Sequence, residues 1–382
     1  MAAYGRSLAP AVDTPLVETT EFGSNPGALR MLSFVPEQLP RGAGLVVVLH
    51  GCGQTAAGYD LGAGWSTLAQ HYGFALLMPE QPASNNANTC FNWFAPEDAA
   101  RGKGEACSIR QMIARMVDDI GIDQHRIFVT GLSAGGAMTS VMLATYPEVF
   151  AAGAIIAGLP FGVATNMREA LSGMFQSPPR PAAELGDLVR NASPHKGPWP
   201  KLSVWHGSAD RTVHPGNADE IVKQWLDVHQ LPSAPMSEGD VDGYPRQVWW
   251  NADGETIVES YTITDMAHGT PLGTAENDER YGAQGAFLID AGISSSYHIA
   301  NFFGLTEWIR QPKVASAAEV KQAVKTVPVI SPAPPSVPDL AKVLWPLTTL
   351  NRRPEPARGP RRRAIDVGAV ITRALTAAGL MK

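Results

Sequence analysis

Hydrophobic positions along this chain gather in short aliphatic runs that predict buried strands. The clearest run, Leu45–His50 (LVVVLH), is bounded by glycines and has no polar residue before its final histidine. Such continuity is typical of a parallel strand that is buried on both faces. Similar runs, each separated by enough chain for a crossover connection, predict further strands at Phe74–Met78, Arg126–Thr130, Ala151–Ala157, Leu202–Trp205 and Ser260–Thr264.

Helical patterns occupy several of the intervals between these runs. The predicted helices are Trp65–Tyr72, Ser108–Ile120, Ala134–Tyr146 and Ala218–His229. Strands that alternate with helices form parallel sheets with helices on their faces. The sequence therefore predicts an α/β fold with a doubly wound, mostly parallel sheet.

Three later segments depart from this alternation. Residues 161–199 are rich in Met, Pro and Ser and lack a strand pattern, which predicts an insertion or lid. Residues 311–364 are Pro-rich and then basic, as expected of a linker. In residues 365–382, apolar positions at helical spacing predict a terminal amphipathic helix that ends at Gly379. We therefore expect one large domain over residues 1–310, followed by the linker and the helix.

Composition fits a globular domain with an appendage. The 382 residues are 45% hydrophobic and 17% charged, which supplies ample apolar material for a buried sheet. The formal net charge of -6 gives no reason to expect a nucleic-acid partner, which normally requires a basic face. There is no run of about 18 apolar residues, so we expect no transmembrane segment. The N-terminus lacks a basic head followed by an apolar stretch and does not resemble a signal peptide.

The most specific motif is Gly131-Leu132-Ser133-Ala134-Gly135. It is a G-x-S-x-G sequence that directly follows a predicted strand and directly precedes a predicted helix. The two glycines permit a sharp turn that lifts the serine hydroxyl above the sheet. Because strand, turn and helix occur in the required order, we interpret Ser133 as a nucleophile. The alternative is a tight glycine turn with an incidental serine.

A serine nucleophile needs a base to take its proton and a carboxylate to orient that base. Asp210 lies just after the predicted strand Leu202–Trp205, and His268 lies just after Ser260–Thr264. Serine, carboxylate, histidine is the chain order of α/β-hydrolases. We therefore predict a triad of Ser133, Asp210 and His268.

Other residues compete for two of these roles. Asp265 and Asp219 are the next candidate carboxylates. His206 precedes Asp210, which breaks the expected order, so we expect it to pack or hydrogen-bond beneath the loop. His298 is expected in a loop that follows no strand end.

The oxyanion hole should combine two backbone amides. One is the amide of Ala134, directly after the nucleophile. The other is expected from the loop after the first predicted strand, His50-Gly51-Cys52-Gly53-Gln54, with Cys52 N–H as the donor. His50 is predicted to support that loop, and an ordinary histidine at a strand end is the alternative. Acyl transfer by these groups needs no metal or organic cofactor.

The chain resembles the poly(3-hydroxybutyrate) depolymerase family of esterases, which includes feruloyl and acetylxylan esterases. The resemblance covers roughly residues 28 to 310 and rests on VVVLHGCGQTAAGYD, CFNWFAPEDAARGKGE, RIFVTGLSAGGAMTSVMLATYPEVFAAGAIIAG, WHGSADRTVHP and MAHGTP. It implies an α/β-hydrolase fold and a serine esterase that acts on a short-chain hydroxyalkanoate polyester or its oligomers. A feruloyl or acetylxylan esterase is the first alternative, and a catalytically silent polymer-binding member is the second. Trp93 and Phe94 suit substrate contact in either esterase, and plain core packing is their alternative.

The resemblance also implies a disulfide between Cys52 and Cys90, which leaves Cys107 unpaired. Three reduced cysteines are the alternative. A disulfide suits an oxidising compartment, so the resemblance implies an extracellular or periplasmic protein. The missing signal peptide keeps a cytoplasmic location as the alternative. The terminal helix could contact a polymer granule, although a helix packed back on the catalytic domain is the simpler expectation.

Overall fold

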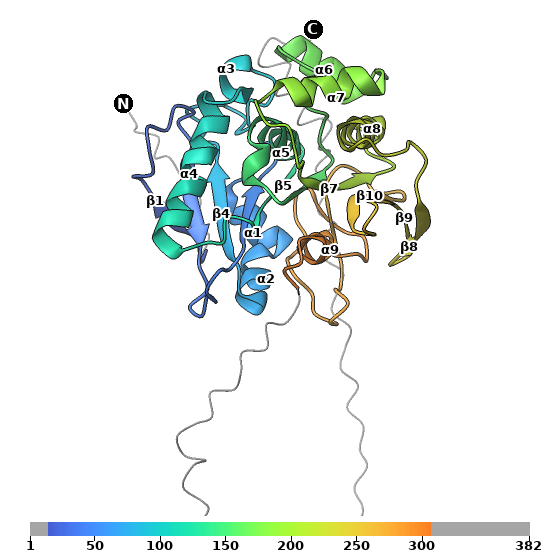
Figure 1. Cartoon of the computed structure of the whole chain (residues 1–382). Coiled ribbons are helices and arrows are strands. Elements are labelled where there is room, and N and C mark those ends of the chain that lie inside the picture. Colours follow the sequence, from blue (N-terminus) through green and yellow to red (C-terminus); the bar gives the residue numbers. More distant parts are fainter. Residues whose placement is uncertain (1–13, 307–382) are drawn as a thin grey trace, which may run out of the picture. The chain divides into compact units, whose positions relative to one another are not determined.

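The computed structural model describes residues 14–306 (Figure 1). The predicted linker at 311–364 and terminal helix at 365–382 lie outside these described residues. No helix in the described range is long and apolar enough to cross a membrane.

A mixed ten-stranded sheet forms the centre of the described part of the chain, in the order β1-β2-β4-β3-β5-β6-β7-β10-β9-β8. Its middle strands are all parallel, and each matches one of the predicted runs: β3 (Leu45–Leu49), β4 (Ala75–Glu80), β5 (Ile127–Leu132), β6 (Ala152–Ile156), β7 (Lys201–Gly207) and β10 (Thr256–Ile263). The predicted doubly wound, mostly parallel sheet is confirmed.

Strand β3 shows why a buried parallel strand lacks a polar face. Leu45, Val47 and Leu49 pack into one hydrophobic core, whereas Val46 and Val48 pack into a second core on the other side of the sheet. All five side chains are fully buried. Because both faces are covered, the strand reads as a continuous apolar run instead of an alternating one.

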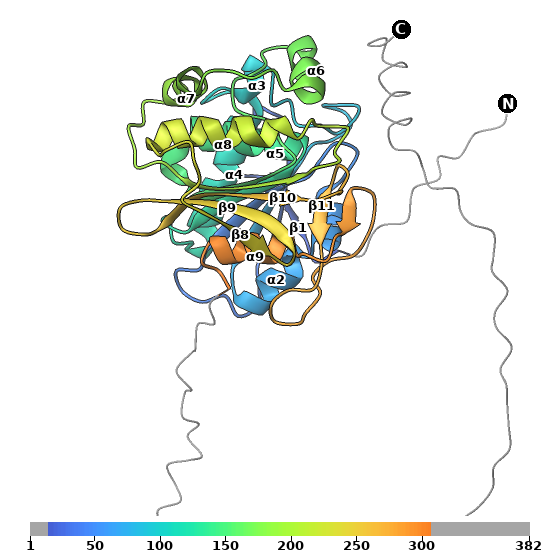
Figure 2. The same ribbon diagram turned by 90° about the vertical axis from the view of Figure 1, so that its right-hand side faces the viewer.

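Helices cover the two faces of the sheet, as Figure 2 shows. One face carries α4 (Gly104–Ile120), α5 (Ala134–Thr145) and α8 (Gly216–His229). The opposite face carries α1 (Ala56–Ala63), α2 (Trp65–Tyr72) and α9 (Ser295–Phe302). The remaining short elements are α3 (Pro96–Ala99), the 3-10 turn η1 (Pro147–Val149) and a small parallel pair, β11 (Thr270–Leu272) with β12 (Leu288–Asp290).

The edge strands were not predicted from the sequence. They are β1 (Val17–Thr19) and β2 (Arg30–Phe34) at one edge and β8 (Ser237–Val241) and β9 (Tyr244–Trp250) at the other, all paired antiparallel. Two residues with positive φ, Asp242 (52°) and Gly243 (82°), connect β8 to β9. Such a turn is typical of two-residue hairpins. His298, expected in a loop, lies instead in α9 and contacts Asp242 Oδ2 at 2.9 Å; the loop expectation was wrong because this short helix begins with polar serines.

Two helices occupy the segment 161–199, namely α6 (Met167–Gln176) and α7 (Ala182–Asn191). The first is tied to the loop after β7, where His214 N donates to Met174 O at 2.7 Å, and to the start of α8, where Asn217 Nδ2 donates to Gly173 O at 3.0 Å. The predicted role of this segment as an insertion or lid stays a prediction.

Candidate active site

Ser133 lies at the turn between β5 and α5, in a strained backbone conformation. Its φ is 58° and its ψ is -117°, a combination that non-glycine residues rarely adopt. A Cβ atom at Gly135 would lie 2.2 Å from Leu49 O, and one at Gly131 would lie 2.4 Å from Gly135 O. Only glycine at these two positions lets the turn approach β3 so closely. The motif therefore has the backbone geometry that the sequence predicted.

The three predicted catalytic residues follow the parallel strands β5, β7 and β10 at the carboxyl ends of the strands, with β6 between β5 and β7. Backbone hydrogen bonds continue beyond the strand ends, from Ser133 N to Ile156 O at 2.9 Å, from Ala157 N to Trp205 O at 2.8 Å and from Ser208 N to Ile263 O at 3.0 Å. The turn with Ser133, the loop with Asp210 and the loop with His268 thus leave the sheet at the same end of its strands. Ligand and catalytic sites of parallel α/β sheets lie at this carboxyl edge.

His268 and Asp210 form a direct, buried contact. His268 Nδ1 lies 2.6 Å from Asp210 Oδ2, and the two residues are 8% and 4% exposed. An ionised carboxylate only accepts hydrogen bonds, so Nδ1 carries the hydrogen. This tautomer leaves His268 Nε2 as the acceptor that a general base needs.

Asp210 is held in its ionised form. Burial raises its pKa, but hydrogen bonds from His206 and His268 outweigh that effect and hold the pKa of Asp210 well below its usual range. The other oxygen, Oδ1, accepts backbone hydrogen bonds from Thr212 N at 2.8 Å and Val213 N at 2.9 Å. The two backbone N–H groups and His268 Nδ1 therefore fix the orientation of this carboxylate.

The competing residues take other positions. His206 is buried, and its Nε2 lies 2.9 Å from Val213 O and 3.3 Å from Asp210 Oδ2. Since a carbonyl only accepts, His206 Nε2 is a donor beneath the loop, as expected. Within residues 14–306, Asp210 is the carboxylate that is hydrogen-bonded to His268, whereas Asp265 and Asp219 are exposed.

The structure does not join all members of the predicted triad directly. Among the described residues, no hydrogen bond links Ser133 Oγ to His268, and Ser133 is half-buried. Such contacts often tighten only when substrate binds.

Two backbone amides have the freedom that an oxyanion hole requires. In the described part of the chain, neither Cys52 N nor Ala134 N is engaged in a hydrogen bond. Ala134 begins α5, so its N–H belongs to the unpaired first turn of a helix. Gly51 N donates to Gln54 Oε1 at 2.8 Å, which closes the loop around Cys52.

His50 begins this loop and is hydrogen-bonded on both ring nitrogens. It is fully buried; its Nδ1 donates to Gly51 O at 2.8 Å, and its Nε2 accepts from Gln81 N at 3.1 Å. Burial lowers the pKa of His50, which keeps the imidazole neutral. The predicted supporting role of His50 stays a prediction.

A disulfide joins Cys52 to Cys90, with 4.3 Å between their Cα atoms, and Cys107 is free. The pairing implied by the family resemblance is thus present. Trp93 is 8% exposed and belongs to the hydrophobic core, whereas Phe94 is half-buried beside it. Their predicted contact with substrate stays a prediction.

Several polar residues near this loop were missed by the sequence reasoning. Gln81 directly follows β4, just as His50 follows β3, and this shared position was the available signal. Asn92 and Glu105 both lie in the segment CFNWFAPEDAARGKGE, which pointed to the family but gave these two residues no individual role. Among the described residues, no group of His, Cys, Asp or Glu side chains could hold a metal ion.

Comparison with known proteins gives consistent matches. A family model described as Esterase PHB depolymerase matches residues 32–237, which contain Ser133 and Asp210. Poly(3-hydroxyalkanoate) depolymerase C of Paucimonas lemoignei is 46% identical over 291 residues, covering 76% of this chain and 70% of that protein. An acetylxylan esterase of Coprinopsis cinerea is 32% identical over 278 residues, covering 69% and 72%. The solved acetyl xylan esterase from Aspergillus awamori has a TM-score of 0.64 at 26% identity, covering 76% of this chain and 99% of that one.

Proposed function

Because this chain belongs to the PHB depolymerase esterase family, we propose that it cleaves the ester bonds of a short-chain poly(3-hydroxyalkanoate) or its oligomers. The chain is a carboxylic ester hydrolase with an α/β-hydrolase fold. The polyester is favoured as substrate because the chain is 46% identical to a polyester depolymerase and 32% identical to acetylxylan esterases.

The contact between His268 and Asp210 is the observation that supports the catalytic roles. It lies at the carboxyl ends of the parallel strands, where Ser133 is also found. Ser133 Oγ attacks the ester carbonyl while His268 Nε2 takes the serine proton. Asp210 stabilises the resulting imidazolium, and the amides of Cys52 and Ala134 donate to the oxyanion. Collapse expels the alcohol, which receives the proton from His268. Water then attacks the acyl-enzyme by the same steps and releases the acid.

The test compares release of 3-hydroxybutyrate from amorphous polyhydroxybutyrate by the wild type and by Ser133→Ala. Ser237→Ala, an exposed serine on the edge strand β8, is the matched control. We expect Ser133→Ala to lose nearly all activity and Ser237→Ala to keep it. Near-normal release by Ser133→Ala would overturn the assignment of the nucleophile.

Acetylxylan or feruloyl ester hydrolysis is the second candidate, supported by the acetylxylan esterase relatives. Acetylated and feruloylated xylan are therefore tested with the same variants. Serine-dependent release of acetate or ferulate alone would move the enzyme to plant polysaccharides. The silent-member alternative loses its support, because the chain belongs to an esterase family.

An extracellular or periplasmic location is proposed from the disulfide, since disulfides persist in oxidising compartments. Fractionation of the native cells tests this, and a protein confined to the cytosol would contradict it. Granule contact through the terminal helix concerns residues outside the described range. It is tested by deleting the residues after Arg310, and unchanged granule binding would exclude it.

A further inference from the structure

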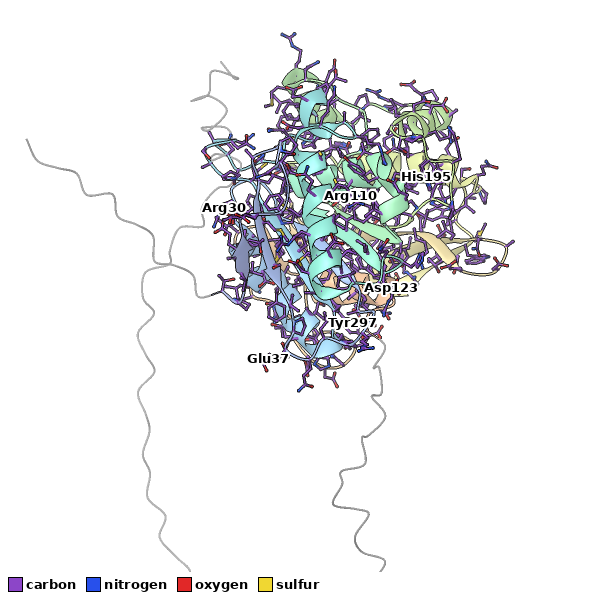
Figure 3. The ribbon with its side chains drawn as sticks, turned by 60° about the vertical axis from the view of Figure 1, so that its left-hand side comes forward. Arg30, Glu37, Arg110, Asp123, His195 and Tyr297 are labelled. Carbon is purple, nitrogen blue, oxygen red and sulfur yellow. A yellow bond between two sulfur atoms is a disulfide. The ribbon has the colours of Figure 1, made fainter. Side chains whose placement is uncertain are left out.

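A buried carboxyl group is linked through hydrogen-bonded neighbours to the oxyanion loop, here defined as His50–Gln54, and takes no part in the proposed acyl transfer. It belongs to Glu105 in the first turn of α4. Arg110 of the same helix, labelled in Figure 3, is half-buried, whereas Glu105 has no exposed surface. Three N–H groups donate to it: Gln81 Nε2 and Asn92 Nδ2 to Oε1, the latter at 2.8 Å, and Asn92 N to Oε2 at 2.8 Å.

One route leads from Glu105 to the loop through Gln81. The side chain of Gln81 is held by Glu105 and also donates to Cys90 O at 3.0 Å. The backbone N–H of Gln81 donates to His50 Nε2 at 3.1 Å, and His50 Nδ1 donates to Gly51 O at 2.8 Å. A displacement of Gln81 would therefore move His50 and, through it, the Gly51–Cys52 peptide unit that carries Cys52 N–H.

A second route passes through the disulfide. Glu105 binds both the backbone and the side chain of Asn92, two residues after Cys90. Cys90 forms a disulfide with Cys52 of the oxyanion loop. The same carboxyl group therefore also anchors the segment to which the disulfide ties the loop. Glu105 is the point at which the two routes meet.

This arrangement is energetically costly. Within residues 14–306, no Lys or Arg forms an ion pair with Glu105, and an acidic neighbour, Asp98, accepts from Glu105 N at 3.3 Å. Burial, with a smaller contribution from the charge of Asp98, raises the pKa of Glu105 to about 8. A buried carboxyl without a cation destabilises a fold unless its hydrogen bonds compensate. An apolar side chain could fill this space at a lower free-energy cost, but it could not accept hydrogen bonds from the three N–H groups.

We propose that Glu105 is a positioning residue that holds the oxyanion loop in the geometry that stabilises the tetrahedral intermediate. The inference rests on the proposed function, since it takes Cys52 N–H as an oxyanion donor. A loop released from Glu105 would still admit the ester but would lose transition-state hydrogen bonding. Such a change lowers kcat and leaves KM unaltered.

The experiment uses the full chain with Glu105→Gln, in which one donor must face the new amide NH2. Hydrolysis of p-nitrophenyl butyrate and inhibition by 1-butaneboronic acid are measured together, because a boronate adduct on Ser133 places an oxygen in the oxyanion hole. We expect kcat to fall about 10- to 100-fold, approaching the loss of one oxyanion donor. The boronate Ki should rise by a similar factor, and KM should stay within about twofold.

Glu259→Gln is the matched control for the loss of a buried carboxyl. Glu259 on β10 is 2% exposed and accepts hydrogen bonds from Ser203 and Arg246. Its replacement should lower Tm while kcat and the boronate Ki remain near wild type. Equal losses of kcat in both variants would reduce the effect to general destabilisation and overturn the proposal.

If Glu105→Gln does not fold, Gln81→Met replaces it, because this change removes the side-chain link but keeps the N–H bound to His50. A folded variant of either kind with wild-type kcat and boronate Ki overturns the role of Glu105. Ser133→Ala separates this outcome from failure of the proposed function. Hydrolysis that persists without Ser133 rejects the site itself, whereas serine-dependent hydrolysis that is insensitive to Glu105 rejects only the positioning role.

Discussion

Replacement of Asp210 by asparagine should reverse the tautomer of His268. Asp210 Oδ1 accepts from two backbone N–H groups at 2.8 and 2.9 Å, and Oδ2 accepts from His268 Nδ1 at 2.6 Å. The new amide has one oxygen and one NH2 group. If the oxygen faced His268, two buried backbone donors would face NH2, at a cost of about 1 to 3 kcal/mol each. The oxygen therefore stays with the backbone.

In Asp210→Asn the NH2 group consequently faces His268 Nδ1. A donor at this position requires Nδ1 to be the acceptor, which moves the hydrogen to Nε2. His268 can then no longer take the proton of Ser133. We expect kcat to fall about 10,000-fold, or about 5.4 kcal/mol in activation free energy.

The assay is kcat for p-nitrophenyl butyrate, combined with 15N NMR of the imidazole to read the tautomer. Asp265→Asn is the control, since this carboxylate is exposed and belongs to the rival assignment. It should retain wild-type kcat. A loss smaller than about tenfold in Asp210→Asn, or an unchanged tautomer, would refute the reasoning. An equal loss in Asp265→Asn would reassign the carboxylate.

Three further predictions concern stability. Replacing both Cys52 and Cys90 by serine opens a loop of 38 residues and should lower the free energy of unfolding by about 4 kcal/mol in urea titrations; a loss below about 1 kcal/mol would contradict this loop-entropy argument. Gly135→Ala would place a Cβ 2.2 Å from a backbone oxygen of β3 and should reduce both Tm and activity, whereas Gly239→Ala, which meets no atom within 4 Å, should change neither. The pKa of Glu105 is raised from 4.5 to about 8, so its contribution to stability is present below pH 4.5 and lost as pH rises towards 8. The stability difference between wild type and Glu105→Gln should therefore change between pH 5 and pH 8, and a constant difference would exclude this titration.

The central sheet could be predicted because burial on both faces leaves a signature in the sequence. Strands such as β3 are continuous apolar runs, and the ends of the predicted strands then locate Ser133, Asp210 and His268 without any knowledge of distances. The contact between His268 and Asp210 is the one that this reasoning required. The edge strands escaped prediction because their exposed positions carry polar residues, which interrupt the apolar pattern.

The positioning network could not be predicted for a different reason. Gln81, Asn92 and Glu105 have no common period, and each belongs to a different local element. Their shared property is a set of tertiary hydrogen bonds between polar groups, which only the folded chain brings together. Local sequence patterns report which face of an element is buried, but they do not report which buried polar groups meet.

The polar edge strand β8 affects how molecules of the enzyme associate with one another at high concentration. A sheet edge offers unpaired backbone groups to which another chain can add. Here β8 is Ser-Glu-Gly-Asp-Val, with Glu238 and Asp240 both exposed. A second copy aligned against this edge would bring like charges together, which opposes sheet-to-sheet aggregation. Many molecules could therefore gather at high local concentration and remain separate, individually active catalysts.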